Sequence, residues 1–193
     1  QRQMCIRDRL YDPGGFTATQ GTSFAVPLVA GAAALVKQRT PSFSAAQLKS
    51  AVVNTATAEL RDGGAQARVT AVGAGKLNAE AAVRTNVTAD PAALSFGVVT
   101  AGALPMSRSL KITNGSSSRL TLAVAPRDQD ANARLTLSAS SVDAGATATL
   151  SVRLEGTLPR PGAYEGTITI RGGAVDLRVP YLYLVGDGAP YNI

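Results

Sequence analysis

The order of apolar and polar residues divides the chain into two parts. Up to residue 85, apolar residues come in long blocks or recur at helical spacing, whereas beyond it they alternate with polar residues in short runs. Gly, Pro, Asn or Asp residues separate those runs, as turns separate strands. The pattern therefore predicts a helical part followed by an all-β part, with the boundary between residues 85 and 90.

Two helices are predicted in the first half of the helical part. Residues 23–37 are apolar on nearly every side, which is typical of a helix buried inside a larger fold. Lys37 and Arg39 place cations at its C-terminal end, where the helix dipole favours them. Ser44 is expected to cap a second helix over residues 45–55, whose apolar positions again recur at helical spacing.

A third, short helix is predicted over residues 79–84, with Asn78 as its N-cap. Two other segments of this part are rich in residues that favour turns and strand ends. Residues 11–21 contain Gly, Thr and Pro, and residues 61–67 are polar and rich in Gly, so both are expected to be loops.

Seven short segments of the second part alternate apolar with polar residues and are predicted strands: residues 94–96, 109–113, 120–124, 135–137, 147–154, 166–170 and 175–179. Strands of this length and spacing predict an antiparallel β-sandwich of immunoglobulin-like or fibronectin type III-like form. Tyr164 precedes the sixth segment, so we expect its hydroxyl to bond back to upstream backbone, as in a tyrosine corner. Residues 181–193 are expected to leave the sandwich.

Composition is that of an ordinary globular protein, with 45% hydrophobic and 17% charged residues. The longest apolar run, residues 24–36, is too short to span a bilayer and contains Pro27. The formal net charge is +6, but the Lys and Arg residues are scattered and lack aromatic partners, which argues against nucleic-acid binding.

The first residues differ in composition from those that follow. Residues 1–10 include Cys5, the single cysteine, so no intrachain disulfide can form. We interpret this segment as a leader that is not native to the protein, with a genuine polar strand or loop as the alternative.

Candidate chemistry lies at the start of the first predicted helix, in Gly21-Thr22-Ser23. Free backbone N–H groups and the helix dipole would stabilise negative charge that develops beside Ser23, and Gly21 would let a substrate approach the backbone closely. Pro27 falls so early in the helix that few completed hydrogen bonds are lost. Taken alone, Gly-Thr-Ser fits an ordinary capped helix start equally well.

Two competing catalytic motifs fit less well. The nucleophile elbow of α/β-hydrolases needs Gly two positions after the serine, where Ala25 stands. A phosphate-binding loop needs Gly-Lys-Ser/Thr after its spacer, which this sequence does not contain.

Residues 21–31, GTSFAVPLVAG, resemble the nucleophile motif of the subtilisin-like serine proteases, the subtilases. Residues 73–83, GAGKLNAEAAV, resemble the closing helix segment of that family, and the resemblance extends over residues 11–85. It implies that Ser23 is the acyl-forming nucleophile, that its N–H is one oxyanion donor, and that Thr22 assists by its hydroxyl or by shaping the loop.

The resemblance also assigns supporting roles within the helix. Ala30 and Gly31 would let the helix pack closely under a sheet, and Pro27 would fix the direction of the chain entering the site. Phe24 and Leu28 stand where the family often has Met and His, a variation that the family tolerates.

In the family's chain order the catalytic serine follows the aspartate and the histidine. This sequence has no histidine, and Ser23 lies about twenty residues from its start. We therefore expect the Asp, the His and the oxyanion-hole Asn to lie outside the chain, which should be inactive by itself. The expected fold is an α/β C-terminal piece of a doubly wound domain, mainly helices here, followed by an all-β antiparallel sandwich.

These expectations give a domain order: a non-native leader (1–10), the C-terminal part of a peptidase domain (11–87), a sandwich (88–185) and a linker toward another module (186–193). The expected function is that of a piece of a secreted or cell-surface serine endopeptidase of bacterial type, with polypeptides as substrates. The sandwich would act as a spacer, a stabiliser of the catalytic domain, or a contact to substrate or cell envelope. The alternative is a non-enzymatic cell-surface binding module that carries a degenerate protease remnant.

No cofactor is expected in these residues, although calcium remains an option for the part of a parent protein outside them. Asp128, Asp130 and Asp143 are interpreted as turn residues rather than calcium ligands. Nucleic acid is not an expected partner, and no membrane span is expected.

Overall fold

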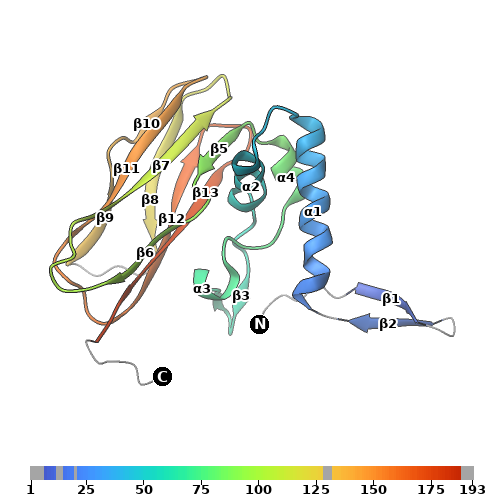
Figure 1. Cartoon of the computed structure of the whole chain (residues 1–193), viewed down its shortest axis with the longest axis horizontal. Coiled ribbons are helices and arrows are strands. Elements are labelled where there is room, and N and C mark those ends of the chain that lie inside the picture. The colour runs from blue at the N-terminus through green and yellow to red at the C-terminus, as the bar shows by residue number, and fades with distance from the viewer. Residues whose placement is uncertain (1–6, 12–14, 20, 128–131, 188–193) are drawn as a thin grey trace.

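The computed structural model describes residues 7–11, 15–19, 21–127 and 132–187. A layer of helices lies beside a β-sandwich, with α1 on the outside and α2 and α4 between α1 and the sandwich (Figure 1). The helices are α1 (Thr22–Arg39), α2 (Ala45–Asn54), α3 (Val69–Val72) and α4 (Ala79–Arg84). None of the described helices is long and apolar enough to cross a membrane.

Helix α1 confirms the predicted apolar helix, extended by a residue or two at each end. Only Ala32 and Val36 of its residues are buried, and they pack with α2 and α4. Most of the remaining apolar surface of α1 faces away from the rest of the described structure. The fold therefore leaves one side of an apolar helix uncovered.

Both predicted caps are present. The hydroxyl of Ser44 accepts a hydrogen bond from the N–H of Gln47 at 3.4 Å, and Oε1 of Gln47 accepts one from the N–H of Ser44 at 3.0 Å. This reciprocal capping box starts α2, which ends one residue before the predicted end. The side chain of Asn78 accepts a hydrogen bond from the N–H of Ala81 at 3.0 Å and starts α4.

Parts of the two segments expected to be loops are strands. Strand β2 (Gly15–Thr19) pairs antiparallel with β1 (Arg7–Tyr11), and β3 (Arg61–Asp62) pairs with β4 (Ala65–Gln66). The turn between β3 and β4 has two consecutive residues with positive φ, Gly63 and Gly64, which a tight hairpin of this kind needs. Such short pairings leave no readable alternation, so the sequence pattern missed them, and it missed α3 as well.

The sandwich consists of two sheets. One has the strand order β10-β8-β12-β13-β6 and the other β5-β7-β11-β9. Their bounds are β5 (Val87–Asp90), β6 (Leu94–Val99), β7 (Met106–Asn114), β8 (Leu120–Pro126), β9 (Ala133–Leu137), β10 (Ser141–Val142), β11 (Thr147–Gly156), β12 (Gly162–Arg171) and β13 (Leu177–Val185). Each of the seven predicted strands coincides with one of these, whereas β5 and β10 were not predicted.

Strand β13 departs from the prediction in two ways. It continues through residues 181–185, which were expected to leave the sandwich, and Tyr181 and Tyr183 are only 3% and 4% exposed. It also pairs parallel with β6, so the sheet is mixed rather than wholly antiparallel. Pro180 caused the early end of the prediction, because proline normally interrupts a strand pattern.

The sandwich core contains Phe96, Leu110, Ile112, Ile168 and further apolar side chains from both sheets. The predicted tyrosine corner is confirmed. The hydroxyl of Tyr164 donates a hydrogen bond to the carbonyl oxygen of Arg160 at 2.7 Å, and its ring stacks on Tyr183 with centroids 4.9 Å apart.

Candidate functional site

Ser23 lies in the first turn of α1, directly after Thr22 and the N-cap residue Gly21. No side chain caps this helix end, and Ser23 is exposed. Within the described part of the chain, its hydroxyl makes no hydrogen bond. An N–H group in the first turn has no partner inside its own helix. The helix start thus presents an alcohol and a backbone donor side by side.

The charges along α1 reinforce its dipole. Its first turn has no acidic residue, and Lys37 and Arg39 lie in its last turn. Nζ of Lys37 donates hydrogen bonds to the carbonyl oxygens of Pro41 at 2.6 Å and Phe43 at 2.9 Å. Cations at the C-terminal end leave the positive end of the dipole at Ser23, where it favours negative charge that forms beside the hydroxyl.

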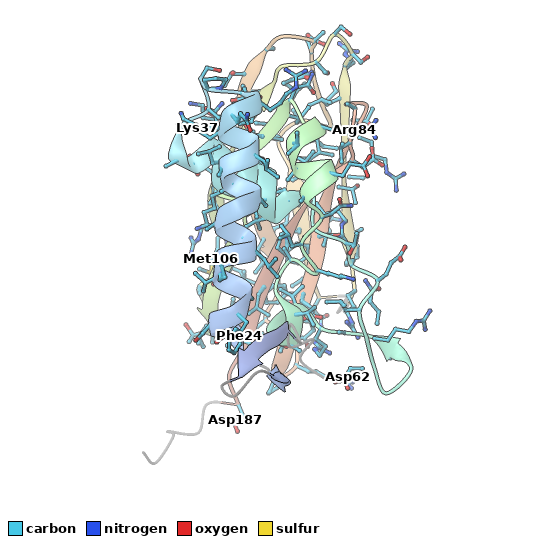
Figure 2. All side chains as sticks on the ribbon, turned by 90° about the vertical axis from the view of Figure 1, so that its right-hand side faces the viewer. Phe24, Lys37, Asp62, Arg84, Met106 and Asp187 are labelled. Atoms are coloured by element: carbon cyan, nitrogen blue, oxygen red, sulfur yellow. The ribbon has the colours of Figure 1, made fainter. Side chains whose placement is uncertain are left out.

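The surroundings of Ser23 are open in this chain. Figure 2 shows Phe24, the residue after Ser23, at the same end of the molecule as Asp62 in the β3–β4 hairpin and Asp187 after β13. Three hollows of the described residues lie away from Ser23: at Tyr181 and Tyr183 in the sandwich, between α1 and α4, and between α2 and the strands β5 and β7.

Pro27 and Gly31, the other two candidate residues, lie inside α1 and are exposed. A Cβ added at Gly31 would meet no atom within 4 Å, so no described residue packs against it. Val26 and Leu35 on the same helix are 65% and 51% exposed. The packing role of Gly31 therefore stays a prediction, and α1 exposes apolar side chains on more than one side.

No three His, Cys, Asp or Glu side chains gather in the described residues so that they could share a metal ion. Asp143 instead binds Arg119, with 2.7 Å between Oδ1 and Nε. Asp128 and Asp130 lie outside the described residues, as does Cys5.

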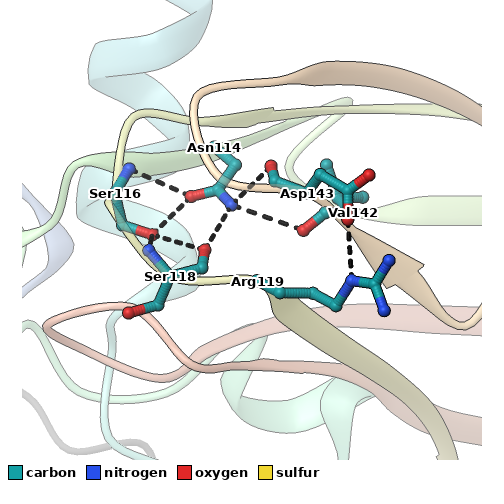
Figure 3. A network of polar contacts seen from close by, with 6 residues as sticks. All are labelled: Asn114, Ser116, Ser118, Arg119, Val142 and Asp143. Carbon is teal, nitrogen blue, oxygen red and sulfur yellow. Dashed lines mark hydrogen bonds and ion pairs between the residues drawn. The ribbon is translucent and has the colours of Figure 1, made fainter.

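A polar network near Asp143 was not foreseen and centres on Asn114, which is 1% exposed (Figure 3). Its Nδ2 donates to the carbonyl oxygens of Ser118 at 2.8 Å and Asp143 at 2.9 Å, and its Oδ1 accepts from the N–H and the hydroxyl of Ser116. The amide of Asn114 is thus saturated by its own protein, so the network orders loops at one end of the sandwich.

Two charged residues of the sandwich lie against the helical part, Glu165 buried and Arg178 half-buried. Glu165 is 0% exposed; it accepts a hydrogen bond from the N–H of Val69 at 3.1 Å, and Arg68 and Arg127 lie 3.6 and 3.5 Å away. Burial lowers the pKa of Arg178, which donates to backbone carbonyls of the helical part. The only sequence signal for either residue was a charge within an alternating strand.

Residues 1–75 match the sequence model of the subtilase family, Peptidase_S8. The minor extracellular protease Vpr of Bacillus subtilis (strain 168) is 30% identical over 181 residues, which are 91% of this chain and 22% of Vpr. The alkaline elastase YaB of Bacillus sp. (strain YaB) is 47% identical over 73 residues, 37% of this chain and 18% of the elastase. The chain thus spans about a fifth of the length of these relatives.

Among solved structures, the ASH / PapD-like domain 7 of human CEP192 aligns with 55% of this chain and 89% of its own, at 17% identity and a TM-score of 0.42. The family match covers all five candidate site residues and ends before the sandwich begins at Val87. The N-terminal part of this chain, residues 1–75, therefore belongs to the subtilase family of serine proteases.

Proposed function

We propose that this chain is part of a secreted serine endopeptidase in which Ser23 forms the acyl-enzyme. The observation that carries the proposal is the position of Ser23: exposed, in the uncapped first turn of α1, with no hydrogen bond to its hydroxyl from the described residues. The names of the relatives, an extracellular protease and an elastase, support secretion and a polypeptide substrate.

In the proposed reaction, Oγ of Ser23 attacks the carbonyl carbon of a peptide bond while a histidine takes its proton. The negative charge moves to the carbonyl oxygen, which the N–H of Ser23 and the N-terminal end of α1 stabilise. The proton then passes to the leaving amine, and water releases the acyl group by the same steps. Thr22 and Gly21 shape the loop at this point.

The sequence contains no histidine, so the base of this mechanism belongs to residues outside the printed chain, together with the carboxylate that orients it. Loss of a triad member lowers turnover by roughly four to six orders of magnitude. The 193-residue chain by itself should therefore cleave no peptide above background.

The test uses the longer protein encoded by the uninterrupted gene. An active-site fluorophosphonate should label it at Ser23, and Ser23→Ala should abolish the label. Ser42→Ala, which alters an exposed serine in the turn after α1, is the matched control and should label fully. Equal labelling of the parent and Ser23→Ala would remove Ser23 from this role.

The same gene decides between the two functional alternatives. An aspartate and a histidine in family positions ahead of Ser23 would fit the peptidase. Their absence there would favour a binding module that retains a protease remnant.

A further inference from the structure

The helical part meets the sandwich at β5, the edge strand of the four-stranded sheet, and on the outer face of the five-stranded sheet. Along β13, Val179 points into the core, so its neighbours Arg178 and Pro180 point outward. An outward position on a sheet is normally solvated. Pro180 is nevertheless buried, and Glu165 on the adjacent β12 is 0% exposed, because α2 and the segment around α3 cover this face.

Helix α2 is bonded to the sandwich by two side chains that are both 0% exposed, Ser50 and Asn54. The hydroxyl of Ser50 accepts a hydrogen bond from the N–H of Ala89 in β5 at 2.7 Å and donates one to Oδ1 of Asn54 at 2.8 Å. Nδ2 of Asn54 donates to the carbonyl oxygens of Ala92 at 2.7 Å and Arg178 at 2.9 Å. Backbone groups of the sandwich therefore depend on this pair for their partners.

A side chain of the sandwich also donates hydrogen bonds to the backbone of the helical part. The guanidinium of Arg178 donates to the carbonyl oxygen of Ala56 after α2 and to that of Ala74 at 3.4 Å. In return, the guanidinium of Arg68 donates to the carbonyl oxygen of Ala163 in β12 at 3.0 Å. Each part thus supplies side chains that satisfy backbone groups of the other, which a freely tethered module could not do.

We infer that the sandwich is a brace for the subtilase segment: the outer face formed by Glu165, Arg178 and Pro180 holds α2 and α3 in place. It is neither a spacer nor an independently tethered binding module. Because α2 in turn packs on α1 around Val36, the brace also supports the helix that carries Ser23. The inference concerns the folding of these helices and holds whether or not Ser23 is a nucleophile.

The brace predicts one cooperative unit, which the 193-residue chain can test without any activity. Denaturant unfolding is followed by the helical circular dichroism band and by tyrosine fluorescence. The chain has no tryptophan, and three of its five tyrosines, Tyr164, Tyr181 and Tyr183, lie in the sandwich, so this fluorescence reports mainly on the sandwich. The two transitions should coincide. A helical transition that precedes the tyrosine transition, or no helical signal at all, would overturn the inference.

Hydrogen exchange of α2 gives the second measurement. Asn54→Ala removes the Nδ2 donor from the carbonyl oxygens of Ala92 and Arg178, so the α2 amides should exchange about ten- to a hundredfold faster. Asn86→Ala removes a comparable bond, Nδ2 to the carbonyl oxygen of Gly115 at 3.1 Å, within the exposed rim and should leave α2 unchanged.

Ser50→Ala is a milder change that keeps the experiment decisive if Asn54→Ala does not fold. It removes the acceptor for the N–H of Ala89 and should accelerate α2 exchange several-fold. Unchanged α2 exchange in the folded variants would refute the brace.

Discussion

Replacing Arg68 should destabilise the chain more than neutralising Glu165, although the two residues face each other. Arg68→Ala leaves the carboxylate of Glu165 buried at 0% exposure with Arg127 as its remaining cation, 3.5 Å away. Removing one partner of a fully buried ion pair costs about 3–5 kcal/mol. Because the Arg68 side chain is 40% exposed, we expect about 2 kcal/mol, plus about 1 kcal/mol for its lost bond to Ala163.

Glu165→Gln keeps an oxygen for the N–H of Val69 and leaves no charge buried. The side chains of Arg68 and Arg127 are 40% and 31% exposed, so both cations can turn toward water, and the loss should be about 1 kcal/mol. In a chain that already carries Glu165→Gln, Arg68→Ala should cost about 2 kcal/mol less than in the parent chain, since no buried charge is left behind and only the bond to Ala163 is lost.

Urea unfolding of the parent chain, the two single variants and the double variant measures the loss caused by each single change and the coupling between Arg68 and Glu165. The coupling should persist at high salt, because the carboxylate is buried and poorly screened. Equal losses for the two single variants, or a coupling indistinguishable from zero, would refute the view that Glu165 depends on Arg68 for its burial.

Two further changes test separate features. Tyr164→Phe removes the hydrogen bond to the carbonyl oxygen of Arg160 but keeps the stacking on Tyr183. The free energy of unfolding in urea should fall by about 1 kcal/mol. No loss would mean that this hydrogen bond contributes nothing to stability. The double change Val26→Lys and Leu35→Lys places charges at two exposed apolar positions on different sides of α1. It should reduce binding of a hydrophobic dye by the isolated chain while stability changes by about 0.5 kcal/mol or less. Undiminished dye binding would show that the dye binds to apolar surface elsewhere.

The sequence predicted the features that depend only on residues close together in the chain. Ser44 and Asn78 start helices because their side chains bond to N–H groups three residues later, and that arrangement needs no distant partner. The alternation of apolar residues likewise revealed the main strands, because one face of each is buried. Gly21, Thr22 and Ser23 were selected as candidate site residues from their order in the sequence, and that assignment stays a prediction.

The sequence did not predict features that depend on contacts between distant parts of the chain. Glu165 and Arg178 sit at outward positions, where alternation indicates solvent, and only the cover provided by the helical part buries or half-buries them. The parallel pairing of β6 with β13 joins strands far apart in the chain, for which no local pattern exists. Pro180 hid the second half of β13 because a strand between two neighbours rarely contains proline.

The place of β13 sets the order in which this protein can assemble as it leaves the ribosome. Its residues close the sheet against β6 and supply Arg178 and Pro180 to the platform beneath α2, so the helices emerge long before their support exists. Until residues 177–185 have been synthesised, the apolar surface by which the helices pack on the sandwich stays exposed. The helix bearing Ser23 is therefore synthesised before the strand that completes its support.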